Sequence, residues 1–343
     1  MNKLYLSKTY ISEIKSLSKS DIFSIYENKT ILIAGGTGLI LSYLIDVLLI
    51  DKSRNLTLIL VVRDKIKAKE RFSYFENDNR IKFIEDDIKN IKYCDYKLDL
   101  IINGASKTDP YNYANYPVEV LIDNIIGSNN LLNLTKLNNA KYVMLSSCEV
   151  YGLNDNETLS IKDNSIINSL EVRSCYNLAK LSSENLCISY NSEYGIDYKI
   201  IRYSRIFGPT IKTSDTKALS QFLFKALNRE DVVLKSNGQQ LFSYQYVADA
   251  IRALTYLINS TKYNVVNSNN EEVYQLRQLA EFIASLSGNK VIYDINDDFN
   301  NKGYSKSKNS VLDISELKEL GFENKFNIFD SLYTTFKILK ELK

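Results

Sequence analysis

A tyrosine and a lysine at helical spacing are the residues of this chain best suited to chemistry. The motif "SCYNLAK" places Tyr176 four residues before Lys180, so the two side chains would share one face of a helix. A phenol has a pKa near ~10 and needs a neighbouring cation to accept a proton near neutral pH, and Lys180 can supply it. Ser147, in the earlier stretch "MLSSCEVYG", can hydrogen-bond the same substrate oxygen. Together these side chains predict the removal of a proton and a hydride from an alcohol.

Composition excludes several other chemistries. The chain has 343 residues and no histidine, which excludes Ser-His-Asp triads, Cys-His pairs and histidine metal sites. Its formal net charge is +2 with Lys and Arg scattered, so no nucleic-acid surface is expected. The apolar run "LSYLIDVLLI" is interrupted by Asp46, and a membrane span would need ~20 apolar residues. The four cysteines lack metal-ligand spacing. We therefore expect a cytoplasmic protein with reduced thiols, no bound metal and no membrane contact.

The stretch "ILIAGGTGLIL", residues 31–41, is typical of a strand that runs into a dinucleotide-binding turn. Gly35 would permit the tight turn, and Gly38 would let the backbone approach a pyrophosphate at the N-terminus of the next helix. Leu41 stands where such turns carry a third glycine. We expect that replacement to alter helix–strand packing more than phosphate contact.

The end of the second strand, "VVRD", bears on the choice of cofactor. A carboxylate there would hold the adenosine ribose hydroxyls of NAD, whereas an arginine would accept the 2′-phosphate of NADP. Asp64 and Arg63 compete for that role, so the sequence leaves both cofactors open.

From residue 30 onward, continuous apolar runs alternate with amphipathic stretches. Such runs are typical of strands buried on both faces, and crossover helices are expected at 119–137 and 176–190. The predicted fold is α/β, a doubly wound parallel sheet of the Rossmann type. The expected strands are 30–34, 56–62, 81–85, 98–105, 141–147 and 198–202.

The alternation of apolar runs and amphipathic stretches changes near residue 205, which predicts a smaller C-terminal substrate-binding lobe. The expected parts are an N-terminal helical extension at 1–29, a dinucleotide-binding domain at 30–204 with 245–268 returning to it, and the lobe at 205–244 and 269–343.

These motifs, in this order, resemble the extended short-chain dehydrogenase/reductase family, specifically its nucleotide-sugar epimerases, dehydratases and decarboxylases. The resemblance runs from residue 30 onward and includes "AGGTGLI", "EDDI", "NGAS", "NIIGSNNLL", "SSCEVYG", "YNLAK", "RIFGP" and "YVADA". It implies that Ser147, Tyr176 and Lys180 are catalytic and that the substrate sugar is oxidised at carbon 4. It also implies a homodimer formed through the helices at 119–137 and 176–190.

The resemblance assigns further site residues. Glu149 would serve as a second acid or base, at carbon 5 or carbon 3 of the sugar. The expected cofactor-binding residues are Gly35, Thr37, Gly38, Leu39, Ile40, Arg63, Asp64, Asp87, Ile88, Ala105, Ser106, Tyr176 and Lys180. The expected substrate-binding residues are Asn124, Cys148, Arg205 and Gln240.

The chain departs from the family pattern at three positions. Cys148 replaces the Asp of dehydratases and the Ser of decarboxylases, so the branch stays open. Phe242 stands where decarboxylases carry an arginine, and Arg205 where the family often carries an asparagine. The exchange is either a relocated phosphate contact or an unrelated structural arginine.

The first hypothesis is an oxidoreductase that modifies a nucleotide-diphosphate sugar through a 4-keto intermediate, with a role in surface polysaccharide precursor synthesis. An alternative is an NADPH-dependent nucleotide-sugar 4-reductase. An alternative of another class is a non-catalytic dinucleotide-binding sensor or scaffold. Leu41, Phe242 and Arg205 favour that last alternative, and the intact serine, tyrosine and lysine argue against it.

Overall fold

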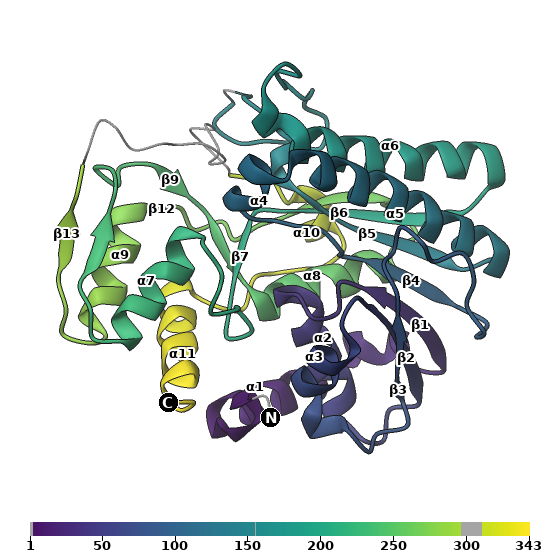
Figure 1. Cartoon of the computed structure of the whole chain (residues 1–343), viewed down its shortest axis with the longest axis horizontal. Helices are drawn as coiled ribbons and strands as arrows, with labels where there is room; N and C mark the ends of the chain where they lie inside the picture. The colour runs from purple at the N-terminus through teal and green to yellow at the C-terminus, as the bar shows by residue number, and fades with distance from the viewer. Residues whose placement is uncertain (1–2, 155, 296–310) are drawn as a thin grey trace.

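The apolar runs form one parallel sheet. The computed structural model describes residues 3–154, 156–295 and 311–343; the remaining residues include 296–310 of the predicted lobe and lie outside the described residues. The sheet has seven strands in the order β11-β6-β5-β4-β1-β2-β3, with every neighbouring pair parallel (Figure 1). This confirms the predicted doubly wound α/β fold. The strands are β1 (Lys29–Ala34), β2 (Leu56–Val62), β3 (Ile81–Glu85), β4 (Leu100–Asn103), β5 (Lys141–Ser147), β6 (Asp197–Tyr203) and β11 (Val265–Ser268).

The strands are apolar on both faces, as the continuous runs predict. In β1, Ile31 and Ile33 pack in one hydrophobic core, whereas Leu32 and Ala34 pack in the other. The chain order reverses between β1 and β4, and doubly wound sheets bind ligands outside the carboxyl ends of the strands at such a point.

Helices cover both faces of the sheet (Figure 1). Helices α2, α3 and α8 contribute to the first core, and α5 and α6 to the second. The helices of this part are α2 (Leu39–Ile50), α3 (Lys65–Arg71), η3 (Ser73–Phe75), α4 (Pro110–Asn115), α5 (Pro117–Asn138), η4 (Cys148–Tyr151), η5 (Val172–Ser174), α6 (Cys175–Tyr194) and α8 (Val247–Asn259).

Most of the C-terminal elements gather beside the sheet, on the left of Figure 1, whereas α10 packs on β11 and α8. They include three two-stranded sheets, β7–β10, β9–β12 and β8–β13. The elements are β7 (Arg205–Phe207), α7 (Ala218–Leu227), β8 (Val232–Leu234), β9 (Leu241–Phe242), β10 (Tyr244–Tyr246), β12 (Tyr274–Gln275), α9 (Leu276–Ser285), β13 (Val291–Tyr293), α10 (Ser315–Glu319) and α11 (Ile328–Lys340). That this part binds substrate stays a prediction.

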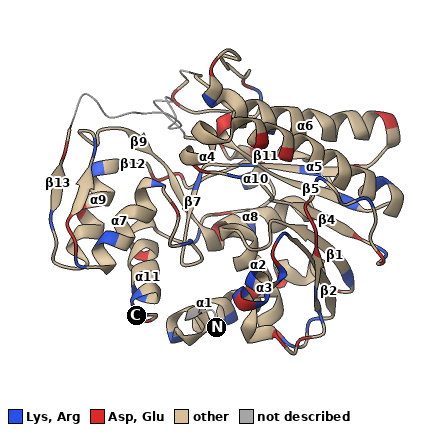
Figure 2. Ribbon diagram, in the orientation of Figure 1, with Lys and Arg blue, Asp and Glu red and all other residues tan. Residues whose placement is uncertain are grey.

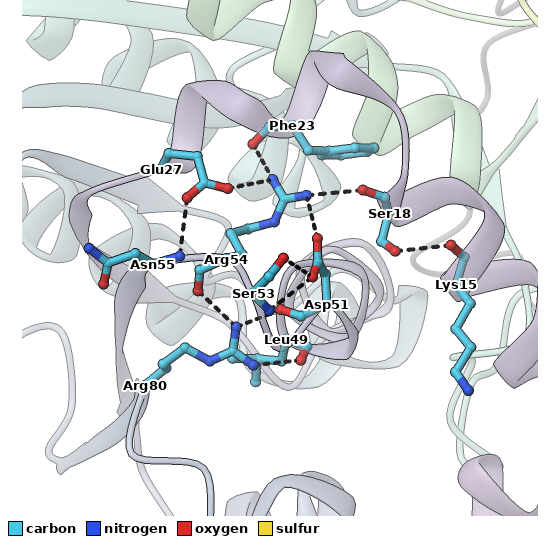
Figure 3. A network of polar contacts seen from close by, with 10 residues as sticks. All are labelled: Lys15, Ser18, Phe23, Glu27, Leu49, Asp51, Ser53, Arg54, Asn55 and Arg80. Atoms are coloured by element: carbon cyan, nitrogen blue, oxygen red, sulfur yellow. Dashed lines mark hydrogen bonds and ion pairs between the residues drawn. The ribbon is translucent and has the colours of Figure 1, made fainter.

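The N-terminal segment forms η1 (Lys3–Leu6), α1 (Lys8–Ser18) and η2 (Asp21–Tyr26), and it packs on α2 and α8. Figure 3 shows the polar part of this contact. Arg54 donates hydrogen bonds to the backbone carbonyls of Phe23 and Ser18 and forms ion pairs with Glu27 and Asp51. A buried arginine from the loop before β2 thus ties the segment to the sheet.

Basic and acidic positions are interspersed over both parts of the molecule (Figure 2). Within the described ranges, no helix combines the length and the apolarity needed to cross a membrane.

Candidate functional site

The glycine turn joins the end of β1 to the start of α2 and brings backbone into close contact with β4. Gly35 has φ +82°, which favours glycine, and a Cβ there would lie 2.6 Å from the carbonyl carbon of Gly104. Gly38 is the N-cap of α2, so the free backbone N–H groups of the helix N-terminus face the turn. Such an N-terminus favours an anionic group such as a pyrophosphate.

Leu41, in place of the third glycine, is accommodated by a glycine on the neighbouring strand. Its side chain is buried, and a Cβ added to Gly104 would come within 2.7 Å of Leu41 Cδ1. A third glycine in the turn would leave space between the helix and the strand. Here Gly104, which follows β4 and has no side chain, leaves that space instead. The replacement therefore changes packing behind the turn and leaves the backbone of the turn open.

A cavity of about 1030 Å³ lies at the carboxyl ends of β1, β2 and β4. It brings together most of the expected cofactor residues: Gly35, Thr37, Gly38, Arg63, Asp64, Asp87, Ile88, Ala105 and Ser106. Leu39 and Ile40, in the first turn of α2, do not line it, and neither do Tyr176 and Lys180 of α6. The glycine cradle and the size of the cavity fit a dinucleotide.

The end of β2 presents its two charged residues differently. Asp64 caps α3: its carboxylate accepts a 2.9 Å hydrogen bond from the Lys67 amide and lies 3.0 Å from the Lys67 ammonium. Arg63 is exposed and lines the cavity, and its charge helps to lower the pKa of Lys212 from the C-terminal part. Lys212 was missed by sequence analysis because no motif contains it and only the fold brings it near Arg63.

Ser147, Tyr176 and Lys180 meet at the carboxyl end of β5, next to β4. Lys180 is 4 % exposed, and its Nζ donates a 3.0 Å hydrogen bond to the carbonyl of Leu145. Burial lowers the pKa of Lys180 to about 8, and the carboxylate of Glu184 opposes this effect. The Lys180 Nζ lies 6.0 Å from the centre of the Tyr176 ring.

Tyr176 differs from the expectation that a neighbouring lysine lowers its pKa. Burial raises the pKa of the phenol, and the opposing effects come from hydrogen bonding with Ser147 and from the charge of Arg173. Tyr113, from α4, stacks on Tyr176 with ring centres 4.8 Å apart. Tyr113 could not be singled out from the sequence, because one tyrosine among 25 gives no signal of its own.

Glu149 is held beside this group by α6 and the turn before it. Its carboxylate lies 3.0 Å from Nη2 of Arg173, and its backbone carbonyl accepts a 2.7 Å hydrogen bond from the Asn177 side chain. Arg173 also lies over the Tyr113 ring, 4.7 Å from its centre. Arg173 therefore links the expected second acid or base to the stack that holds Tyr176.

The four expected substrate residues are not all brought together. Cys148 and Arg205 are electrostatic neighbours. The Asn124 side chain is buried and donates a 2.7 Å hydrogen bond to the Val120 carbonyl of its own helix. Gln240 is exposed and accepts a hydrogen bond from Ser236. The hydrogen bonds of the Asn124 and Gln240 side chains are thus made with residues of their own segments.

No cluster of three or more potential metal ligands occurs among the residues that the structure describes.

Comparison with known proteins identifies the family. Residues 31–268 match the NAD dependent epimerase/dehydratase family. The chain is 30% identical over 276 residues to UDP-glucuronic acid decarboxylase 1 of Xenopus tropicalis, covering 80% of this chain and 63% of the relative. It thus spans less than two thirds of that relative's length. It is 29% identical over 314 residues to UDP-glucuronic acid decarboxylase 6 of Arabidopsis thaliana, covering 89% of this chain and 87% of the relative.

Solved structures share the fold. One is UDP-glucose 4-epimerase from Thermotoga maritima with UDP-glucose, at TM-score 0.79 and 22% identity, covering 91% of this chain and 98% of that one. Another is UDP-glucuronic acid 4-epimerase from Bacillus cereus with UDP-glucuronic acid and NAD, at TM-score 0.78 and 21% identity, covering 92% and 100%. With the match over residues 31–268, these findings confirm the resemblance: the chain belongs to the NAD dependent epimerase/dehydratase family.

Proposed function

We propose that this chain is an NAD-dependent enzyme that oxidises carbon 4 of a nucleotide-diphosphate sugar and then modifies the resulting ketone. The observation that carries the proposal is the gathering of Ser147, Tyr176 and Lys180 at the carboxyl end of β5, the same edge of the sheet at which the cavity lies. The names of the similar proteins, which are decarboxylases and epimerases of UDP-sugars, support a sugar nucleotide as the substrate. Such a product would supply surface polysaccharide synthesis.

The residues divide the oxidation between them. Ser147 would hydrogen-bond the sugar hydroxyl, and Tyr176 would take its proton as the hydride leaves carbon 4. Bound NAD supplies the hydride acceptor. Because burial raises the pKa of Tyr176, the cationic form of Lys180 is needed beside the site to favour the phenolate. Glu149 would then move the second proton, at carbon 5 or carbon 3, with Arg173 orienting its carboxylate.

The test is Tyr176→Phe, assayed on UDP-glucose, UDP-glucuronic acid and dTDP-glucose. The wild type should convert at least one of them, and the product identifies epimerisation, dehydration or decarboxylation. Loss of the phenol should reduce turnover by at least ~100-fold while the protein still binds NAD. Tyr194→Phe, on the exposed surface of the same helix, is the control and should keep full activity. Equal turnover by Tyr176→Phe would refute the assignment, and cofactor binding without turnover by the wild type would indicate a sensor or scaffold.

A second candidate is an NADPH-dependent reductase of a 4-keto sugar nucleotide. It is favoured by Arg63, which lines the cavity with Lys212 nearby, while Asp64 is engaged with Lys67. Denaturing the purified protein and identifying the released dinucleotide separates the two. Retained NAD supports the first proposal, whereas a protein isolated empty that binds NADPH more tightly than NADH supports the reductase.

We further propose that the protein forms a homodimer through α5 and α6, which lie side by side. Val118, Ile122 and Ile126 recur at four-residue spacing on α5 and are all exposed, and Ile188 of α6 is exposed as well. Ile126→Glu should halve the mass measured by light scattering. The control is Ile66→Glu, at an exposed position of α3, which should leave the mass unchanged. A wild type that is a monomer would refute the proposal.

A further inference from the structure

Arg205, at the start of β7, is a partly buried cation in an unusual environment. Its guanidinium lies over the ring of Phe242, with Cζ 4.1 Å from the ring centre. Nη1 is buried and has no hydrogen-bond partner. Among the residues that the structure describes, no carboxylate forms an ion pair with it. A buried charge without a counter-charge is costly, so this guanidinium lacks the partner that burial requires.

The other shielded arginines of the chain have such partners. Arg71 lies 2.6 Å from a carboxylate oxygen of Asp46, and Arg202 lies 2.7 Å from one of Glu184. These pairs show that the fold normally neutralises an arginine withdrawn from water. The exception at Arg205 is therefore informative, because a guanidinium left free beside a binding site is suited to an anionic ligand.

The position of Arg205 relates it to the reacting group. Its charge acts on Cys148, the residue between Ser147 and Glu149, and partly offsets the rise that burial causes in the pKa of that thiol. Its strand pairs with β10, where Tyr244 lies opposite Arg205. The guanidinium thus lies between the C-terminal elements and the catalytic segment, where a substrate sugar would meet both.

Phe242 has a specific part in this arrangement. Stacking on a ring fixes the plane of a guanidinium and leaves its N–H groups free along the edge. The resemblance places an arginine at position 242, on β9, in the decarboxylases, whereas this chain has Phe242 there and an arginine at 205. The structure places the two side chains in contact, so the positive charge occupies the same locality but comes from β7.

We propose that Arg205, held by Phe242, binds an anionic group of the nucleotide sugar and thereby selects the substrate. This inference rests on the proposed function. The group is a pair of anionic oxygens, from either the carboxylate of a uronic acid or the diphosphate. Both match the two-pronged donor geometry of a guanidinium.

The test is binding to the cofactor-loaded protein, measured by calorimetry with UDP, UDP-glucose and UDP-glucuronic acid. Arg205→Gln removes the charge, and Arg205→Lys keeps it without the fork. Arg229→Gln, which removes an exposed arginine after α7, is the control and should leave all affinities unchanged. Circular dichroism and NAD content check that each variant is folded.

The pattern of loss identifies the anion. If Arg205 binds a uronate carboxylate, Arg205→Gln lowers the affinity for UDP-glucuronic acid by at least ~10-fold and leaves the affinities for UDP and UDP-glucose unchanged. If Arg205 binds the diphosphate, the affinities for all three nucleotides fall by a similar factor. In both cases Arg205→Lys should lose less than Arg205→Gln, and the double variant Arg205→Asn/Phe242→Arg should recover part of the affinity.

Two results overturn the proposal in distinguishable ways. Unchanged affinities in a folded Arg205→Gln, with tight binding by the wild type, refute the role of Arg205 and leave the proposed function standing. A wild type that binds NAD but none of the three nucleotides refutes both. If Arg205→Gln does not fold, Arg205→Lys decides. Affinities equal to those of the wild type for all three ligands would show that the two-pronged contact of the guanidinium is not made, which refutes the proposal.

Discussion

At the scale of single residues, the turn after β1 depends on space as much as on conformation. Gly35 and Gly195 both have positive φ, at +82° and +71°, so an alanine at either should cost ~1–2 kcal/mol of backbone strain. A Cβ at Gly195 would meet nothing within 4 Å, whereas at Gly35 it would meet backbone at 2.6 Å. Gly35→Ala should therefore lose a further ~1–3 kcal/mol and most of its NAD affinity.

Urea unfolding and NAD titration of the two variants check this prediction. Gly195→Ala, at the C-terminal end of α6, controls for the conformational strain alone. Equal losses of stability in the two variants, with NAD binding intact in both, would show that the contact with Gly104 is not limiting.

The same contact marks a limit of sequence reasoning about residues. The sequence predicts that Leu41 changes the packing of α2, and it does so correctly. It does not predict that Gly104 makes room for Leu41, because the two are far apart in the chain and meet only through the sheet. Tyr113 and Arg173 were missed for the same reason: their roles come from stacking across elements rather than from a motif.

At the scale of elements, one face of α6 carries the chemistry. Tyr176, Lys180 and Glu184 follow at four-residue spacing, and all three are buried. Glu184 accepts hydrogen bonds from the Ser146 hydroxyl, at 2.5 Å, and from Arg202 Nη2, at 2.7 Å. Its negative charge raises the pKa of Lys180 against the effect of burial, so it helps to keep the lysine cationic.

This geometry predicts a pH effect. Turnover needs the cationic form of Lys180 and should fall as pH rises through about 8. Glu184→Gln removes the negative charge, so the pKa of Lys180 should drop and the alkaline limb of kcat should move to lower pH. Glu193→Gln, exposed on the same helix, should leave the limb in place. A uniformly lower kcat with no shift of the limb would show that Glu184 only supports the fold.

Elements were more predictable than sites because their signals are local. Six continuous apolar runs gave six strands of the sheet, since burial on both faces leaves no polar alternation in the sequence. Within the predicted N-terminal helical extension, the segment Asp21–Tyr26 forms a 3-10 helix. Its pattern is too short to distinguish that geometry from an α-helix.

At the scale of the whole molecule, the N-terminal segment links the sheet to the C-terminal elements. Glu13 of α1 accepts hydrogen bonds from the phenols of Tyr43 in α2, at 2.5 Å, and Tyr246 in β10, at 2.8 Å. Near the chain ends, the Ser7 hydroxyl donates a 2.6 Å hydrogen bond to Glu341, which follows α11. Figure 1 shows α1 and the C-terminus close together. The substrate contact proposed above for Arg205 lies between the two parts that this segment joins.

The carboxyl group of Glu13 should make this link sensitive to pH. Burial raises its pKa above the ordinary value, and the hydrogen bonds from Tyr43 and Tyr246 only partly oppose the rise. Between the ordinary pKa and the raised one, the unfolded chain has lost the proton and the folded protein keeps it. Stability contributed by this group is therefore complete below the ordinary pKa and is lost as pH rises through the raised one.

Glu13→Gln tests the link because an amide accepts the same hydrogen bonds and does not titrate. The variant should match the wild type in acid and become the more stable of the two as pH rises to neutrality, because only the wild type then loses the contribution of its protonated carboxyl group. Urea midpoints measured across that range check this, with the exposed Glu76→Gln as the control for net charge. A stability difference that stays constant with pH would mean that Glu13 is ionised in the folded protein, and that its contacts with α2 and β10 act as a charged bridge instead.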